Sequence, residues 1–144
     1  MSEFQYKLVS GQEQLAEAFQ VRREVFVVEQ AIDQREEFDG LDDQALHMVV
    51  VDGPDTIATA RVRFLSNSRA KLERMAVLKP YRRHGVGTQI INHLMEHLRQ
   101  RQIKEVVLHA QCAVVPFYEA SGFLTVGSTF WEAGIEHIKM KKRL

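Results

Sequence analysis

The chain has 144 residues, an apolar fraction of 45% and a charged fraction of 26%, a composition typical of one globular domain and not of a disordered chain. Its 19 basic and 19 acidic side chains balance, which excludes the broad positive field of a nucleic-acid-binding protein. The single cysteine, Cys112, excludes an internal disulfide and fits a reducing compartment.

The opening sequence MSEFQYKLV lacks the basic start and the apolar run of a signal peptide. No stretch approaches the ~18 uncharged apolar residues that a membrane-spanning helix needs. We therefore expect a soluble cytoplasmic protein with a single domain over residues 1–144, and neither a membrane nor nucleic acid as its partner.

The first half of the chain predicts one long helix among several strands. Residues 11–30 have a helical apolar period, with Leu15, Ala18, Phe19, Val21, Val25, Phe26 and Val28 on one face. The acidic segment 33–43 reads as irregular. Strand patterns cover residues 4–9, 44–52, 56–65 and 70–78. In the third of these, small or apolar residues alternate with Thr59, Arg61 and Arg63, which predicts a half-buried strand.

The second half predicts two helices and three strands. Ile90, Ile91, Leu94, Met95 and Leu98 mark an amphipathic helix that ends near Gln102. A short helix over 114–122 has Pro116 in its first turn and Gly122 at its end. Strands are expected at 105–111, 123–130 and 134–142. The order β-α-β-β-β-α-β-α-β-β indicates an α/β (α+β) domain with a mixed, mostly antiparallel central sheet flanked by helices.

Two charged residues interrupt the apolar face of the first helix. Arg22 and Glu29 both fall within the apolar arc, where a charge is costly unless it is paired. The sequence favours a pair between them, and the alternative is that one of them points into a substrate cleft. The acidic segment that follows favours a solvated loop, with attraction of a cationic amine as the alternative.

The stretch YRRHGVGTQI, residues 81–90, places two arginines and two glycines at the start of a helix. A helix start offers unpaired N–H groups and a partial positive charge, and glycine lets a phosphate approach the backbone. A Walker loop is excluded because its lysine is missing, and a dinucleotide fingerprint because position 90 is isoleucine. The spacing alone fits either a phosphate cradle or an ordinary glycine-containing loop.

Two motifs resemble those of the GNAT superfamily of acyl-CoA-dependent N-acetyltransferases. Residues 82–87, RRHGVG, match the family signature [Q/R]-x-x-G-x-[G/A], and ERMAVLKPYR before them is similar to its splayed strand. HAQCAVVPFYEASGF resembles its second signature, and the order of elements agrees over nearly the whole chain.

The resemblance implies acetyl-CoA as cosubstrate and an amine as acceptor, with no metal. It assigns the pyrophosphate to a loop and the pantetheine arm to the backbone of Met75, Ala76 and Val77. The loop residues are Arg82, Arg83, His84, Gly85, Val86, Gly87 and Thr88. Gln111, at a strand end, is expected to contact the cofactor or to order a water molecule.

The reaction needs a proton donor for the leaving thiolate and an acceptor for the amine proton. Tyr118 matches the tyrosine of the family and is the predicted general acid, with a packed core aromatic as its alternative. Glu73 lies two residues before Met75, which for a regular strand places the two on the same face, and it is the candidate base. An exposed strand glutamate is the alternative.

Other interpretations stay open at this stage. The segment VRREVFVVEQ is similar to small acetyltransferases and more distantly to acyl-homoserine-lactone synthases, which transfer an acyl group to S-adenosylmethionine. A non-catalytic CoA-binding module needs the two glycines but not Tyr118. The HxxEH pattern at 93–97 resembles a zinc-peptidase motif, but its residues fall mostly opposite the apolar helix face. Dimers are common in the resembled family, and the sequence leaves the assembly open.

Overall fold

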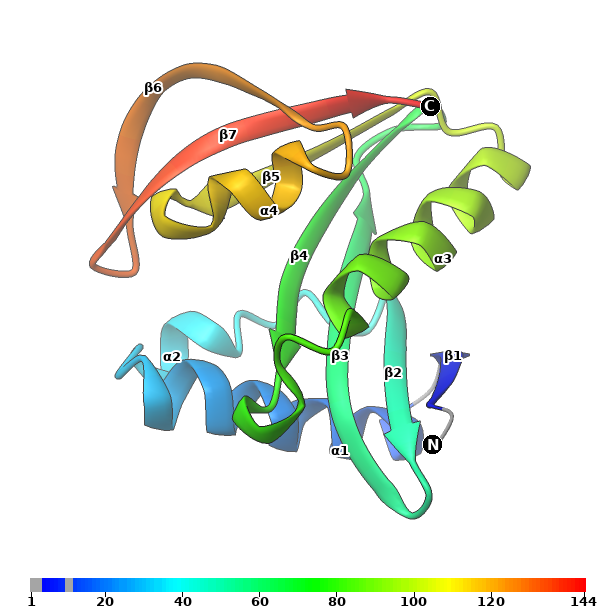
Figure 1. Cartoon of the computed structure of the whole chain (residues 1–144), viewed down its shortest axis with the longest axis vertical. Coiled ribbons are helices and arrows are strands. Elements are labelled where there is room, and N and C mark those ends of the chain that lie inside the picture. The colour runs from blue at the N-terminus through cyan, green and yellow to red at the C-terminus, as the bar shows by residue number, and fades with distance from the viewer. Residues whose placement is uncertain (1–3, 10–11) are drawn as a thin grey trace.

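The computed structural model describes residues 4–9 and 12–144, so position 11, where the first helix was predicted to begin, lies outside the described residues. The N-terminal elements are β1 (Gln5–Val9), α1 (Gln12–Arg22), η1 (Arg23–Glu29), α2 (Gln34–Glu37), β2 (Leu46–Asp52), β3 (Asp55–Phe64) and β4 (Arg69–Val77). The remaining elements are η2 (Lys79–Tyr81), α3 (Val86–Gln100), β5 (Glu105–Gln111), η3 (Cys112–Val114), α4 (Val115–Glu119), β6 (Leu124–Glu132) and β7 (Ile135–Arg143). Figure 1 shows their arrangement.

The described strands form one seven-stranded sheet with the order β1-β2-β3-β4-β5-β7-β6. Neighbouring strands pair antiparallel, except β4 and β5, which are parallel and are connected through α3. A parallel pair needs such a crossover, whereas β2–β3, β3–β4 and β6–β7 are joined by short turns. The predicted mixed, mostly antiparallel sheet flanked by helices is confirmed.

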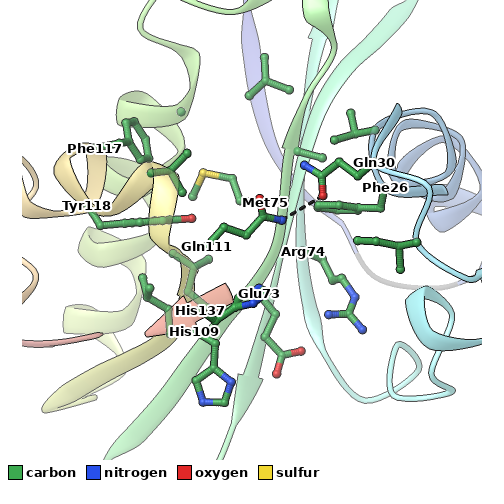
Figure 2. A pocket seen from close by; sticks show the side chains of 18 of the residues that line it. Phe26, Gln30, Glu73, Arg74, Met75, His109, Gln111, Phe117, Tyr118 and His137 are labelled. Atoms are coloured by element: carbon green, nitrogen blue, oxygen red, sulfur yellow. Dashed lines mark hydrogen bonds between the residues drawn. The ribbon is translucent and has the colours of Figure 1, made fainter. Parts of the chain in front are cut away.

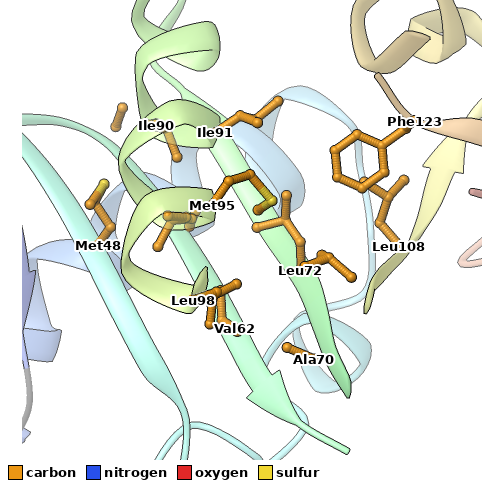
Figure 3. Packing of buried hydrophobic residues seen from close by; sticks show 14 of the residues in the cluster. Met48, Val62, Ala70, Leu72, Ile90, Ile91, Met95, Leu98, Leu108 and Phe123 are labelled. Atoms are coloured by element: carbon orange, nitrogen blue, oxygen red, sulfur yellow. The ribbon is translucent and has the colours of Figure 1, made fainter. Parts of the chain in front are cut away.

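Helix α3 covers one face of the sheet and carries the main core. Ile90, Ile91, Leu94, Met95 and Leu98 are all buried, as their spacing predicts. They pack on Met48, Val62, Leu72 and Leu108 of four successive strands (Figure 3). Among the described helices, none is long and apolar enough to cross a membrane.

The opposite face is covered by α1 and η1. Leu15 and Ala18 pack on Val9 and Val49, and Val21 and Val25 form a neighbouring cluster with Ala76. Strand β3 therefore has helices on both sides, and Thr59 and Arg61 are each only 1% exposed. The prediction of a half-buried β3 is wrong, because the alternating polar side chains face a second layer instead of solvent.

The predicted long helix changes its geometry at Arg23. Residues Arg23–Glu29 form a π-helix, and the N–H of Gln30 bonds to the carbonyl of Val25, five residues back. This wider turn ends the regular apolar period, so Val28 is 63% exposed and not on the buried face as predicted. The acidic segment is also more ordered than predicted, since Asp33 caps α2 by accepting a hydrogen bond from the Arg35 N–H.

Strand β4 contains a bulge at Arg74. Glu73 pairs with Arg61, whereas Ala76 pairs with Thr59, so one residue of β3 between these pairs faces two of β4. Arg74 has a φ of 53°, which is uncommon for a residue with a side chain. The bulge reverses the alternation: Met75 packs with the α3 core, while Glu73 lies on the other face with Arg61. The prediction that Glu73 and Met75 share a face is therefore wrong.

Candidate active site

A cleft of about 960 Å³ crosses the middle of the sheet. Its walls come from the end of η1, the bulged half of β4, the start of α3, the end of β5, and the residues around the β6–β7 turn. Figure 2 shows Tyr118 and Phe117 on one side of β4, and Phe26 and Gln30 on the other. The cleft thus joins the two faces of the sheet.

The cleft exists because β4 and β5 separate. Their pairing runs from Arg69 with Glu105 to Leu72 with Leu108 and then stops, although both strands continue. The segment 73–77 of β4 lines the cleft and keeps its pairing to β3 on the other edge. Met75, Ala76 and Val77 thus stand on an open strand edge, to which an extended chain can hydrogen-bond.

The glycine loop ends at one end of the cleft, at the N-terminus of α3. The first helical hydrogen bond runs from the Gln89 N–H to the Gly85 carbonyl, so the amides of Val86, Gly87 and Thr88 have no partner within the helix. Gly85 has a φ of 79°, and the space beside its Cα is open. This end of α3 has the free amides, the dipole and the room that an anion requires.

The structure requires glycine at position 87 for a different reason from that at position 85. A methyl group at position 87 would lie 2.8 Å from Cζ of Phe117. Gly87 therefore lets the ring of Phe117 from α4 pack directly against the start of α3. Its absent Cβ makes room for the Phe117 ring of a neighbouring helix, and the approach of a phosphate to this backbone stays a prediction.

Of the loop's basic residues, Arg82 is the most firmly held. Its guanidinium forms two hydrogen bonds to the Glu29 carboxylate, at 2.7 and 2.8 Å, and donates to the Val77 carbonyl at 2.8 Å. Arg83 and His84 are exposed, and Arg83 has a φ of 65°. The loop therefore presents one tethered guanidinium, that of Arg82, and one exposed arginine, Arg83, beside the α3 terminus.

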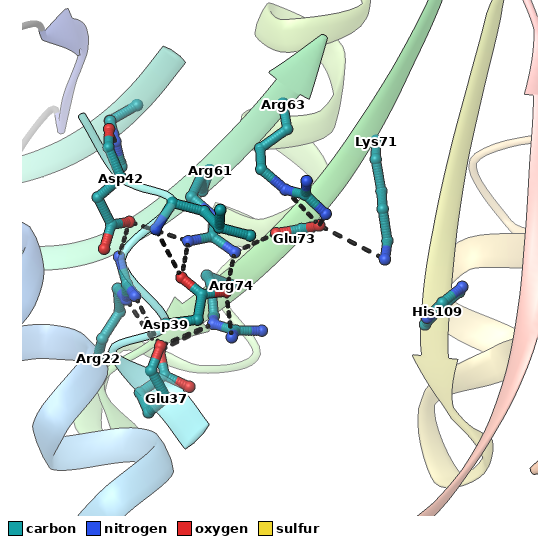
Figure 4. Close-up of polar contacts among 12 residues, drawn as sticks. Arg22, Glu37, Asp39, Asp42, Arg61, Arg63, Lys71, Glu73, Arg74 and His109 are labelled. Carbon is teal, nitrogen blue, oxygen red and sulfur yellow. Dashed lines mark hydrogen bonds and ion pairs between the residues drawn. The ribbon is translucent and has the colours of Figure 1, made fainter. Parts of the chain in front are cut away.

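The predicted Arg22–Glu29 pair is wrong. Arg22 is 1% exposed and bonds to Glu37 at 2.8 Å and Asp42 at 2.6 Å (Figure 4). Glu29 bonds to Arg82 instead. Neither Arg22 nor Glu29 lines the cleft. A one-dimensional helical pattern cannot show partners that come from 15 and 20 residues further along the chain.

The acidic segment supplies most of a buried ion network beside the cleft. Glu37, Asp39 and Asp42 contact Arg22, Arg61 and Arg74, and burial of Glu37 raises its pKa despite these cations. The prediction of a solvated acidic loop is wrong for Glu37 and Asp42, which are 3% and 7% exposed. These carboxylates fix the loop to β3 and β4 and are not free to attract an amine.

Glu73 belongs to the same network. Its carboxylate accepts hydrogen bonds from Arg61 and Arg63 and lies 3.5 Å from the Lys71 ammonium. Burial opposes its charge, but the hydrogen bonds from the two arginines prevail and lower the pKa of Glu73 to about 2. Glu73 lines the cleft as an ionised carboxylate with little tendency to accept a proton.

Tyr118 and Gln111 both line the cleft. Tyr118 is half-buried against Phe117 and Phe123, and desolvation raises its pKa to about 12. Gln111, at the end of β5, donates from Nε2 to Oε1 of Gln30 at 2.9 Å, across β4 (Figure 2). This bond joins η1 to β5 over the strand gap.

Two histidines of the cleft wall were not among the acid–base residues that the sequence predicted for the acetyl transfer. Nδ1 of His109 lies 3.0 Å from Oε2 of Glu132, and Nδ1 of His137 lies 2.7 Å from the Ile135 carbonyl. His109 and His137 come from neighbouring strands and both flank the ring of Phe130. In the sequence, His109 is marked as unusual by its place between apolar residues of a predicted strand. Its carboxylate partner, Glu132, becomes apparent only in the tertiary structure.

The HxxEH histidines stand apart from the cleft. His93 stacks on Tyr6, and Glu96 lies 3.6 Å from Arg99. In the described part of the chain, no group of three or more His, Cys, Asp or Glu residues is arranged to hold a metal ion.

Comparison with known proteins agrees with this architecture. The family model of the acetyltransferase (GNAT) domain matches residues 8–144. The chain is 38% identical to the uncharacterized N-acetyltransferase YjcF of Bacillus subtilis over 94% of this chain and 96% of that protein.

Two solved structures show the same fold. An acyl-CoA N-acyltransferase from Pseudomonas aeruginosa is 25% identical, with a TM-score of 0.86 over 97% of this chain and 99% of that one. A GNAT family acetyltransferase from Elizabethkingia anophelis, solved with acetyl-CoA bound, is 12% identical, with a TM-score of 0.75 over 96% of this chain and 98% of that one. The open sheet, the glycine loop at the head of α3 and the matching sequence model together lead to one conclusion: this chain belongs to the GNAT acetyltransferase family.

Proposed function

We propose that this protein transfers the acetyl group of acetyl-CoA to a primary amine of a small molecule or peptide by direct attack. The observation that carries the proposal is the continuity of the cleft. It runs from the free amides at the start of α3, along the open edge of β4, to the hydroxyl-bearing ring of Tyr118. An anion site, an edge for an extended arm and a proton donor follow one another in the order in which acetyl-CoA would need them.

The loop from Arg82 to Thr88 binds the pyrophosphate in this proposal. The amides of Val86, Gly87 and Thr88 donate to its oxygens, and Arg83 adds an exposed positive charge. Arg82 contributes its charge from a position fixed by Glu29. The positive φ of Gly85 turns the chain into the helix, and the open space beside it leaves room for the phosphates.

The backbone of Met75, Ala76 and Val77 pairs with the pantetheine arm. Since β5 has already diverged, the arm takes the place of a missing strand neighbour on β4. In this proposal Gln111, on the opposite wall, exchanges its hydrogen bond to Gln30 for one to the arm.

Tyr118 protonates the leaving thiolate. Its raised pKa, about 12, keeps the phenol protonated throughout the neutral range, so the donor is always present. A cysteine-like thiol has a pKa near 8.5 in water, and the desolvation that acts on Tyr118 acts on a thiolate beside it as well. Desolvation therefore raises the pKa of both the proton donor, Tyr118, and the proton acceptor, the CoA thiolate.

The acceptor amine enters from the η1 side, between the acidic loop and the β6–β7 turn. Glu36, Arg74, His109 and Glu132 line this half of the cleft. Arg22 is fully engaged behind the wall, and Glu29 acts through Arg82, so neither is proposed to contact the acceptor. Glu73, the base suggested by the sequence, is surrounded by three cations that oppose its protonation.

A screen of amines with acetyl-CoA and free-thiol detection tests the proposal. We expect amine-dependent release of CoA thiol and formation of an N-acetyl product. Release that requires S-adenosylmethionine would indicate a lactone-synthase-like reaction, and binding of CoA without turnover of any amine would indicate a non-catalytic module.

The position of the cosubstrate is tested separately by calorimetry. Gly85→Val should weaken CoA binding strongly, because valine resists a positive φ and fills the open space at the α3 terminus. Gly53→Val is the matched control, since Gly53 has a φ of 58° and open space but lies in the β2–β3 turn, outside the cleft. Equal CoA affinity in the Gly85 variant and the wild type would show that the pyrophosphate binds elsewhere.

A further inference from the structure

His109 and Glu132 form a hydrogen-bonded pair on the wall of the cleft. A carboxylate only accepts hydrogen bonds, so the 3.0 Å contact from Nδ1 to Oε2 places the ring proton on Nδ1. The neutral ring then keeps the lone pair of Nε2 for another partner. A histidine whose Nδ1–H is hydrogen-bonded to a carboxylate has the arrangement that orients Nε2 as a general base.

His109 stands where β4 and β5 separate. It follows Leu108, the last residue of β5 that pairs with β4. Leu108 and Ala110 point into the α3 core, so His109 between them points to the face that carries η1. Tyr118 packs against Phe123 in the α3 core, on the other side of the gap. A donor and an acceptor of protons thus flank the gap from opposite faces.

The packing around His109 fixes its ring. Phe130 of β6 meets it edge to face, with 5.0 Å between the ring centroids. The charged and titratable groups that face it are Lys71 and Glu73 of β4, Glu132 of β6, and His137 and Lys139 of β7. Lys71 and Glu73 contact one another within the ion network (Figure 4), and Glu132 is the direct partner of the ring.

The other candidates for the base are less suited to this role. Glu73 accepts hydrogen bonds from Arg61 and Arg63 and would have to give these up to take a proton. His137 is buried, and its Nδ1 bonds to a backbone carbonyl, which offers no charge to stabilise an imidazolium.

We propose that His109 is the general base of the acetyl transfer and that Glu132 is its positioning residue. This role rests on the proposed function. The amine, bound as the free base, attacks the thioester carbonyl carbon with its lone pair and forms the C–N bond. Nε2 of His109 takes a proton from the nitrogen as the C–S bond breaks, and the leaving thiolate takes the proton of Tyr118. The products are the amide and the CoA thiol, and water returns His109 and Tyr118 to their starting states.

The test is a set of variants assayed with an amine that the screen identifies as an acceptor. We expect His109→Gln to lower kcat by about 100-fold with acetyl-CoA affinity within about twofold of wild type, as expected for loss of a general base. The acidic limb of the pH profile of kcat/KM should disappear in this variant. Added imidazole should restore part of the activity of His109→Ala. Glu132→Gln should lower kcat by about 10-fold and move the acidic limb to lower pH, because the imidazolium loses its counter-charge.

His93→Gln is the matched control, because this exposed histidine lies on the outer side of α3 against Tyr6. It should keep the wild-type rate and the wild-type pH profile. If His109→Gln keeps wild-type kcat and its acidic limb, the role of His109 is overturned while the proposed function stands. A wild-type protein that acetylates no amine overturns both.

Discussion

Glu29 and Arg82 form a two-point ion pair that ties the end of η1 to the glycine loop, with N–O distances of 2.7 and 2.8 Å. The hydrogen bond from Arg82 lowers the pKa of Glu29, so the pair stays ionised at neutral pH. The pair places a fixed negative charge beside a loop that we propose binds a diphosphate. The Glu29–Arg82 pair therefore connects η1, on the proposed acceptor side of the cleft, to the loop on the proposed cosubstrate side.

Replacement of Glu29 by Gln should tighten CoA binding by about 2- to 5-fold at low ionic strength, because a partly exposed like charge next to the anion is removed. The gain in affinity should shrink as salt is added, because the Debye length falls from roughly 20 Å to roughly 6 Å between about 20 and about 300 mM salt. Calorimetry over this range measures the effect. Stability should change by less than about 1 kcal/mol, since the pair is partly exposed. Weaker binding at all salt concentrations would mean instead that the pair is needed to position Arg82.

The contact between Gly87 and Phe117 predicts that substitutions at these two positions have non-additive effects on the free energy of unfolding. Gly87→Ala should destabilise the fold by about 1–3 kcal/mol, because its methyl group overlaps the Phe117 ring. Phe117→Leu in the same chain should recover part of this loss, which urea denaturation of the two single variants and the double variant would measure. Strictly additive losses would show that the ring is not the obstacle.

Tyr118→Phe should reduce turnover by about 10-fold or more and leave the acetyl-CoA affinity within about twofold, since only the proton donor is lost. The raised pKa of Tyr118, about 12, also predicts no basic limb from this residue below about pH 10 in the profile of the wild type. Tyr6→Phe is the control, because Tyr6 stacks on His93 away from the cleft. Equal turnover in Tyr118→Phe and the wild type would remove Tyr118 as the acid.

Glu73 gives a prediction about acid stability. Its pKa in the folded protein, about 2, lies below the ordinary value of 4.5, so its ion pairs stabilise the fold above pH 4.5 and lose this effect as the pH falls toward 2. Glu73→Gln should cost about 3 kcal/mol at pH 7, and the difference from wild type should shrink steadily below pH 4.5. Urea denaturation at several pH values measures this.

Glu105→Gln provides the comparison for that series. Glu105 pairs with the more exposed Arg69 at 3.0 Å, and its loss should cost less than about 1 kcal/mol. Similar costs for the two variants would contradict the distinction between the buried network and the surface pair.

Local patterns predicted the fold well where burial follows a simple period. Ile90 to Leu98 form the buried stripe of α3, and the chain order of strands and helices gave the mixed sheet. The pattern failed at the π-helix and at the Arg74 bulge, where one residue changes the phase of the chain. No periodicity marks such a shift, and the face assigned to Glu73 was wrong for this reason.

The candidate site could be predicted only in part from the sequence, for a related reason. The glycine loop is contiguous in sequence, so RRHGVG could be found by its spacing. The partners of Arg22, Glu29 and His109 come from segments 15 to 53 residues away and depend on the packing of the fold. Motifs therefore predicted the proposed cosubstrate end of the cleft, whereas the acid–base groups of the acceptor end needed the three-dimensional structure.

The divergence of β4 and β5 also has a mechanical consequence. Among the described residues, four register pairs, from Arg69–Glu105 to Leu72–Leu108, join strands β1 to β4 to strands β5, β6 and β7. A ligand bound in the cleft would contact both groups of strands and restrain their separation. Occupancy of the cleft should therefore slow amide exchange in β5 and β7 as well as at the residues that the ligand touches.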